Sequence, residues 1–270
     1  TWLGAGFGGD EWNDYWDERY HLQDVLDNYN GSVYIVWGMQ DWNVDPYHAF
    51  PTHELLRQQG INVRTIAGQW AHNYPDQPDR HSEVTSGYGA EAYPNMTRFD
   101  WAVELFPWFE YYLKGIGDEP ESYVQMQRND GRWHIEETWP AEDTSVLQVS
   151  GDGGNQRVSS TSGGFEITLE ISDEPIHISG LPTLHTDVST GLCNGGQLFV
   201  TMKDAESGLR LGHATMDVRY RDGGYDSKPT ASLSSYRMLM EFNPMDVIVP
   251  SGILTLQFSE SGEDYIPSPC

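Results

Sequence analysis

The sequence predicts a chain of two parts, an α/β region with a parallel sheet followed by an all-β sandwich of the jelly-roll type. Up to about residue 118, apolar strand-like runs alternate with helix-like stretches, as they do in βαβ units. Beyond that point, short alternating segments are separated by Gly, Asp and Ser turns, and no helical pattern follows. We therefore expect one domain over residues 1–118 and a β-sandwich domain over residues 119–270.

The α/β region begins with a continuous apolar run at 33–37, the kind of sequence that forms a strand covered on both faces. A helix is expected next, opening at Asp45 or near Thr52 and stopping before Gly60. Residues 61–66 then form the next strand. Because a strand, a helix and a strand with short connections make a βαβ unit, the two strands should be parallel.

A second helix is expected after a loop at 69–96, which is long enough to indicate a functional role. Thr97 is placed to cap this helix, and Gly115 is placed to end it in a left-handed turn. Its apolar residues have the i, i+3/i+4, i+7 spacing of a helix with one buried face. These residues are Phe99, Val103, Phe106, Phe109 or Glu110, and Leu113.

Three segments of the second part, 165–169, 197–202 and 253–258, have the pattern of strands bounded by turn residues. Many short strands at near-regular spacing are typical of a β-sandwich or jelly roll. The second part is therefore expected to be built from strands alone.

The composition excludes several classes of protein. The chain has 41 acidic and 15 basic residues and a net charge of −26, so its surface would repel a nucleic acid. Aromatic residues make up 13%, which argues against an acidic disordered chain. No stretch reaches the ~20 apolar residues of a membrane span, and no signal pattern is visible. We expect no membrane partner and a cytoplasmic protein, with secretion left open.

The excess of carboxylates is also informative about the solvent. Only Lys114, Lys203 and Lys228 are lysines. At molar salt the screening length falls to about 3 Å, so the repulsion within such a chain nearly vanishes. We therefore expect a high-salt environment, and an ordinary acidic protein is the alternative.

The two cysteines, Cys193 and Cys270, are too few for a disulfide framework and are expected to be free thiols. No Cys/His spacing typical of a metal site occurs, and the pair His72 and His81 is a weak zinc signal. We expect neither a metal nor a cofactor.

Two residues stand just beyond the carboxyl ends of strands, where open parallel sheets meet their ligands. Asp41 follows the first strand and His72 follows the second. An acid, one βα unit and then a histidine make up the later part of the Ser…Asp…His order of the α/β-hydrolase fold. In such a triad the carboxylate fixes the imidazole, which takes the proton of a serine. A turn-forming Asp and a solvated His are the alternative interpretation.

The sequences of these loops resemble those of a known family, the Xaa-Pro dipeptidyl-peptidases, which are grouped with cocaine-esterase-like hydrolases and acylases. The most specific segment is Gly-Met-Gln-Asp-Trp-Asn-Val at 38–44, and Gly-Gln-Trp-Ala-His at 68–72 follows it. The other similar segments are 15–19, 108–115, 185–192 and 212–221. The resemblance implies the C-terminal part of an α/β-hydrolase domain followed by a jelly roll, with Asp41 as the triad acid and His72 as the general base.

One departure from the family pattern concerns the nucleophile. No Gly-x-Ser-x-Gly elbow precedes Asp41, where the only serine is Ser32, at the start of a strand. We therefore expect a C-terminal fragment whose serine and oxyanion hole belong to an upstream part of the same protein. The chain by itself is expected to be inactive.

The resemblance implies a serine hydrolase that removes X-Pro dipeptides from the N-terminus of a peptide. An ester hydrolase or acylase of the same superfamily is the alternative, and so is a non-catalytic β-sandwich binding module. Trp42, Asn43 and Trp70 flank the two loop residues. They are candidates for contacts with the peptide or ester substrate, or for packing beneath the loops. A homo-oligomer stays open.

Overall fold

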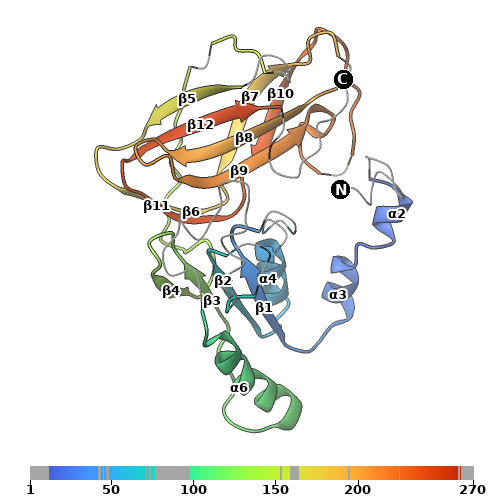
Figure 1. Cartoon of the computed structure of the whole chain (residues 1–270). Coiled ribbons are helices and arrows are strands. Elements are labelled where there is room, and N and C mark those ends of the chain that lie inside the picture. Colours follow the sequence, from blue (N-terminus) through green and yellow to red (C-terminus); the bar gives the residue numbers. More distant parts are fainter. Residues whose placement is uncertain are drawn as a thin grey trace.

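The computed structural model describes residues 12–41, 44, 46, 49–70, 72, 74–76, 98–152, 154–158, 164–193, 195–224, 226–260 and 262. It has an α/β region and a β-sandwich, and the strand pair β11–β6 is the part of the sandwich nearest the α/β region (Figure 1). Within the described residues, no helix is both long enough and apolar enough to cross a bilayer.

The α/β region is built on a four-stranded sheet in the order β1-β2-β3-β4. The first three strands run parallel, and β4 is antiparallel to β3. Its elements are α2 (Asp14–Asp17), α3 (Leu22–Asn28), β1 (Val33–Gly38), α4 (Ala49–Gln58), β2 (Val63–Gly68), α6 (Trp101–Lys114), β3 (Tyr123–Gln127) and β4 (Trp133–Glu136). The parallel strand pair and both expected helices are thus confirmed, whereas α2 and α3 were not expected. The sheet also continues past residue 118, where the sequence placed the end of the first domain.

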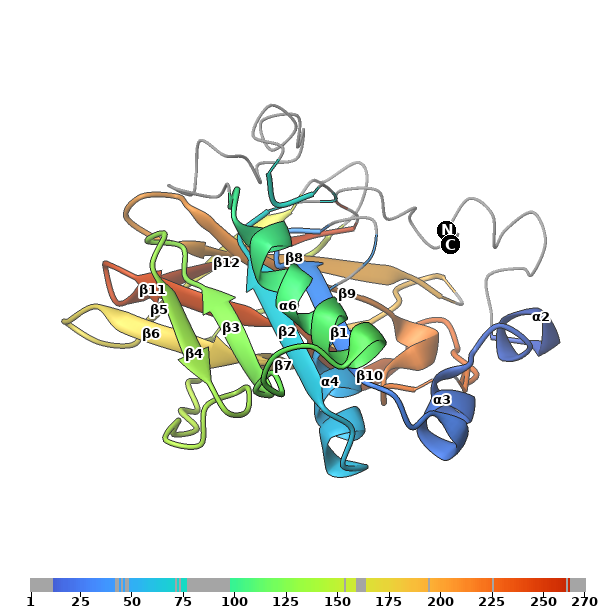
Figure 2. The same cartoon turned by 90° about the horizontal axis from the view of Figure 1, so that it is seen from below.

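The helices α4 and α6 cover opposite faces of this sheet. Leu56 of α4 packs in one cluster with Val33 and Ile35 of β1. Trp108 of α6 instead contacts Tyr34, with the ring centroids 5.3 Å apart. Because neighbouring side chains of a strand point to opposite faces, the two contacts lie on the two sides of β1. Figure 2 shows α6 lying across β1 and β2.

The expected ends of α6 agree with the structure only in part. Gly115 has φ 67° and closes the helix in the left-handed conformation, as predicted. Asp100, rather than Thr97, occupies the N-cap position, and Thr97 lies outside the described residues.

The predicted buried face of α6 is wrong. Its residues are exposed in the structure, whereas Trp108, on another side of the helix, is the buried one. The exposed fractions are Phe99 73%, Val103 70%, Phe106 65%, Phe109 47% and Leu113 75%. The periodicity correctly identified an apolar stripe, but the described residues do not cover it.

The second region consists of antiparallel strands, as expected. The sheet β5-β12-β8-β9 has four strands, and two further pairs are β10-β7 and β11-β6. The strands are β5 (Phe165–Glu170), β6 (Ile176–Gly180), β7 (Thr183–Ser189), β8 (Gln197–Asp204), β9 (Arg210–Asp217), β10 (Ser235–Glu241), β11 (Met245–Val249) and β12 (Ile253–Ser259), with a 3-10 turn η2 (Val218–Tyr220). One apolar cluster joins the four-stranded sheet to β10 and β11, so the region is a sandwich. Its description as a jelly roll stays a prediction.

The state of the cysteines differs from the expectation. Cys193 is disulfide-bonded, so the prediction of a free thiol was wrong for this residue. Cys270 lies outside the described residues. A count of two cysteines carries no signal of a disulfide, which is why composition alone suggested thiols.

Candidate active site

The loops that follow β1 and β2 are held together beyond the ends of the strands. Gly38 and Gly68 are the last paired residues of the two parallel strands. The amide of Met39 then donates to the carbonyl of Gly68 at 2.8 Å, and the amide of Gln40 donates to the carbonyl of Trp70 at 3.1 Å. These bonds extend the strand pairing into the loops and bring the segments that carry Asp41 and His72 side by side.

The two predicted triad residues are brought together by this arrangement. Nδ1 of His72 lies 2.9 Å from Oδ2 of Asp41. The other carboxylate oxygen, Oδ1, accepts the amide hydrogen of Val44 at 2.9 Å. An ionised carboxylate only accepts hydrogen bonds, so Nδ1 carries the proton and Nε2, on the far side of the ring, has the lone pair.

The two side chains differ in exposure in a way that suits an acid and a base. The Asp41 side chain is 10% exposed, and the His72 side chain is 50% exposed. The carboxylate is therefore largely withdrawn from solvent, while half of the imidazole side chain remains exposed. This geometry is what a hydroxyl nucleophile needs from its two partners.

Gly68 is required by the way Trp70 packs. A Cβ at Gly68 would lie 1.9 Å from Cζ3 of the Trp70 ring, which no side chain permits. The ring itself is 1% exposed, and its centroid is 5.8 Å from that of Trp133. Its burial favours the packing role that the sequence left open over a substrate contact. The other two substrate-binding candidates, Trp42 and Asn43, lie outside the described residues.

Sequence reasoning missed three buried glutamines next to this pair. Gln40 precedes Asp41, Gln69 follows β2, and Gln127 ends β3; all three are 5% exposed or less. Nε2 of Gln40 donates to Oε1 of Gln69 at 2.8 Å. A polar residue directly after an apolar strand was the available signal, but its partner on the next loop could not be identified from the sequence.

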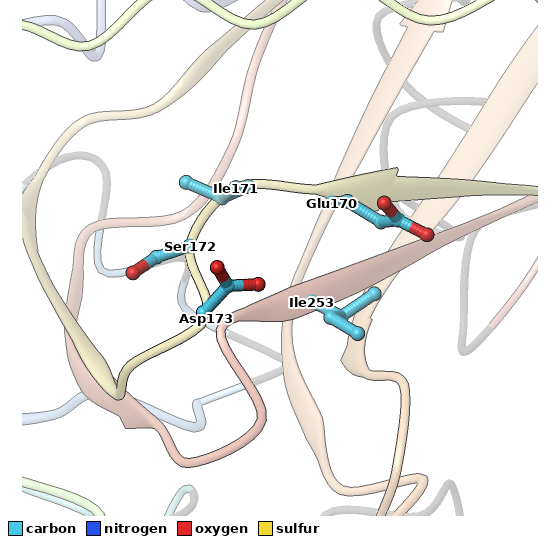
Figure 3. Close-up of a pocket in the computed structure, with 5 residues that line it drawn as sticks. All are labelled: Glu170, Ile171, Ser172, Asp173 and Ile253. Atoms are coloured by element: carbon cyan, nitrogen blue, oxygen red, sulfur yellow. The ribbon is translucent and has the colours of Figure 1, made fainter.

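Within the described residues, no group of three or more His, Cys, Asp or Glu side chains is arranged to hold a metal ion. A hollow of about 210 Å³ lies in the sandwich, where β5 ends and β12 begins. Figure 3 shows its lining, which contains neither Asp41 nor His72; the lining residues are Glu170, Ile171, Ser172, Asp173 and Ile253. The hollow is therefore separate from the candidate site.

Comparison with curated proteins finds relatives with one recurring name. A putative Xaa-Pro dipeptidyl-peptidase of Bacillus anthracis is 28% identical over 131 residues, which is 48% of this chain and 18% of the relative. The Xaa-Pro dipeptidyl-peptidase of Ligilactobacillus salivarius is 22% identical over 167 residues, 60% of this chain and 18% of the relative. The matches thus span less than a fifth of these longer relatives. No protein-family model matches the chain.

Solved structures share the fold over nearly the whole chain. An aminopeptidase from a marine sediment Thaumarchaeota archaeon aligns with a TM-score of 0.71 at 15% identity, covering 97% of this chain and 52% of that one. An α-amino acid ester hydrolase aligns with a TM-score of 0.66 at 16% identity, covering 99% and 54%. A CocE/NonD family hydrolase of Staphylococcus aureus aligns with a TM-score of 0.66 at 13% identity, covering 98% and 52%.

The chain therefore spans about half the length of the structures that share its fold. These neighbours are hydrolases or a peptidase by name, as are the curated relatives. Together they confirm the resemblance of this chain to the Xaa-Pro dipeptidyl-peptidase and cocaine-esterase-like hydrolase family, which the loop motifs had predicted.

Proposed function

We propose that Asp41 and His72 are the acid and the base of a Ser-His-Asp triad whose serine is supplied by an upstream part of the same protein. The observation that carries this proposal is the hydrogen bond of 2.9 Å between the two side chains at the carboxyl ends of neighbouring parallel strands. A buried carboxylate that orients a half-exposed imidazole is the part of the triad that prepares a hydroxyl for attack.

The reaction follows from this geometry. Nε2 of His72 takes the proton of the serine hydroxyl as its oxygen bonds to the substrate carbonyl carbon. The imidazolium, stabilised by Asp41, then gives the proton to the leaving amine or alcohol, and the bond to the leaving group breaks. A water molecule repeats the two steps on the acyl-enzyme, which releases the acid and restores the serine.

The substrate that we propose is a peptide with an N-terminal X-Pro pair, because the curated relatives carry the name Xaa-Pro dipeptidyl-peptidase. An ester hydrolase is the second candidate, since one of the solved structures with this fold is an α-amino acid ester hydrolase. Both reactions use the same acyl-transfer chemistry at the triad and differ in the pocket.

Three features of β1 and α6 support an upstream part that completes the α/β region. Within the described strands, β1 lies at the edge of the sheet, although its sequence is that of a covered strand. Tyr34 Oη and Trp37 Nε1 on β1 are buried and have no hydrogen-bond partner among the described residues. The apolar stripe of α6 is also exposed. We propose that the upstream part adds strands at β1 and packs a helix on this stripe, since the solved relatives are about twice as long.

A reactivity experiment tests the assignment. A fluorophosphonate probe, which labels activated serines, should leave this chain unlabelled and should label a longer protein that includes the upstream part. In the longer protein, His72→Ala should lower the labelling rate and the turnover of Gly-Pro and ester chromogens by about 10⁴-fold or more, and Asp41→Asn by about 10⁴-fold.

Matched controls are available on the exposed face of β7. His185→Ala and Asp187→Asn make the same changes in exposed residues of the sandwich, and they should leave both rates unchanged. Labelling of this chain alone would contradict an upstream serine. A longer protein whose His72→Ala variant keeps full turnover would contradict the triad, and a non-catalytic binding module would then be the better description.

A further inference from the structure

A chain of buried amides connects the candidate site to the third strand of the sheet. Oε1 of Gln69 accepts from Gln40 at 2.8 Å, and Nε2 of Gln69 donates to the carbonyl of Gln127 at 2.8 Å. The backbone amide of Gln69 also donates to Oε1 of Gln127 at 3.1 Å. The three residues are 5%, 1% and 0% exposed in the order Gln40, Gln69 and Gln127. Buried amides that are paired in this way hold one another in a single arrangement.

The hairpin β3–β4 at the far end of this chain is attached to strand β11 of the sandwich. The side chain of Asn129 donates to the carbonyl of Ile248 at 2.8 Å and accepts from the amide of Ile248 at 2.7 Å. It therefore pairs with β11 as a neighbouring strand would. Since Asn129 lies two residues after Gln127, the position of the amide chain is tied to that of β11.

A buried carboxylate also attaches the β3–β4 hairpin to strand β11. Asp246 of β11 is 0% exposed, and its Oδ2 lies 3.0 Å from Nε2 of His134 on β4. Its Oδ1 lies 2.6 Å from Nε2 of His177 on β6, and the indole nitrogen of Trp139 donates to Oδ2 at 3.3 Å. A charge without solvent needs such partners, so moving β4 away from β11 would be costly.

We propose that strand β11 determines the placement of the Asp41–His72 pair through this amide chain, with Gln69 as a positioning residue. The proposal rests on the proposed function, because it concerns the triad assigned there. Gln69 lies between Gly68 and Trp70. The carbonyl of Gly68 accepts a hydrogen bond from the amide of Met39, and the carbonyl of Trp70 accepts one from the amide of Gln40. One side chain therefore holds both loops. Without its amide, Gln40 Nε2 loses its partner inside the core, and the loops must shift to find water.

The central variant is Gln69→Leu, with Gln197→Leu as its matched control. Gln197 is a half-buried glutamine on β8, in the sandwich, so its variant makes the same chemical change away from the loops. The double variant Gln40→Leu/Gln69→Leu replaces both members of one hydrogen bond by apolar groups, which restores part of the stability but not the connection. Together, the three variants distinguish a loss of stability from a loss of positioning.

The first readout concerns the ring of His72 in this chain. ¹⁵N NMR gives the populations of its two tautomers, and hydrogen exchange gives the rate at which its Nδ1 proton is replaced from solvent. Gln69→Leu and the double variant should each speed the exchange by about 10-fold or more and mix the tautomers, because a displaced loop weakens the bond to Asp41. Gln197→Leu should change neither. The same exchange rate in Gln69→Leu and in the unmodified chain would overturn the proposal.

The second readout is kinetic and uses the longer protein. Gln69→Leu should lower kcat by about 10²-fold, the cost of a small misplacement of catalytic groups, while KM changes by less than about 3-fold. An unchanged kcat would overturn the positioning role. If the unmodified longer protein is inactive but His72 still responds to Gln69→Leu, the proposed function fails while the structural connection stands.

Discussion

The two regions of the molecule differ in how completely they bury their apolar residues. In the sandwich, 13 buried residues form a single cluster that joins its sheets. In the α/β region, the buried apolar residues form three smaller clusters, and the apolar stripe of α6 is exposed. A sandwich completes its core with its own two layers, whereas a parallel sheet needs further strands and helices to cover both faces. Among the described residues, the sandwich therefore has the more continuous apolar core, and the α/β region leaves more apolar surface exposed.

The same contrast is visible within the parallel sheet. Four of the six residues of the second strand, β2, are completely buried, among them Val63 and Ile66. Five of the six residues of β1 are only half-buried, although β1 is the more apolar of the two strands, since β2 contains Arg64 and Thr65. Position at the edge, rather than composition, makes the difference.

The largest expected effect on stability comes from making the same substitution, Phe to Ala, in each of the two regions. Phe242 in the sandwich is 1% exposed, and Phe106 on α6 is 65% exposed. Phe242→Ala should lower the free energy of unfolding of this chain by about 3–5 kcal/mol, because it leaves a cavity. Phe106→Ala should change it by less than about 0.5 kcal/mol, as an exposed site does. Denaturant unfolding measures both, and similar losses would mean that α6 is packed in solution.

The stability cost of the α6 substitution should differ in the longer protein that we propose. There Phe106→Ala should become costly, by about 2 kcal/mol or more, because the upstream part would cover the stripe. Phe242→Ala should cost the same in both proteins. A Phe106 variant that stays neutral in the longer protein would contradict the docking of the upstream part on α6.

An intermediate effect concerns the contact between the regions and depends on pH. Hydrogen bonds from His134 and His177 offset the burial of Asp246 and lower its pKa from 3.8 to about 2. The resulting contribution, about 2 kcal/mol, is present above pH 3.8 and is lost as the pH falls towards 2. Asp246, aided by Glu136, raises the pKa of His134 above 6.5. The stability that this histidine contributes is therefore present below pH 6.5 and is lost as the pH rises through the raised value.

Asp246→Asn should therefore destabilise the chain most between about pH 4 and 6.5, and less on either side. Unfolding free energies of the variant and the unmodified chain, measured across this range, check the shape. The exposed Asp187→Asn on β7 serves as a control that should show no such maximum. A difference that does not vary with pH would mean that the carboxylate–imidazole contacts do not form.

The smallest expected effect comes from salt, and it should not distinguish the regions. With a net charge of −26, we propose that the protein works in concentrated salt. Raising the salt from 0.1 to 2 M should increase the free energy of unfolding by on the order of 1 kcal/mol through screening of surface carboxylates. The cost of Phe242→Ala should be unchanged by salt, since packing is not screened. A fall in stability with salt would contradict the proposal.

The sequence by itself determined the local features of this protein. Apolar runs identified β1, β2 and the strand segments of the sandwich, and Gly115 ended α6 as its left-handed conformation requires. The loop motifs singled out Asp41 and His72, because an acid and a histidine after consecutive parallel strands must meet at one sheet edge.

Tertiary structure decided what these features contact. Periodicity showed that α6 has an apolar stripe, but whether anything covers it depends on segments distant in the sequence. The joining of β3 to the parallel sheet, the amide chain through Gln69 and the pairing of Asp246 with His134 join residues that are 29 to 112 positions apart. The physical reason is that side-chain spacing encodes which face of an element is apolar or polar, whereas its partner is selected only when the whole chain is packed.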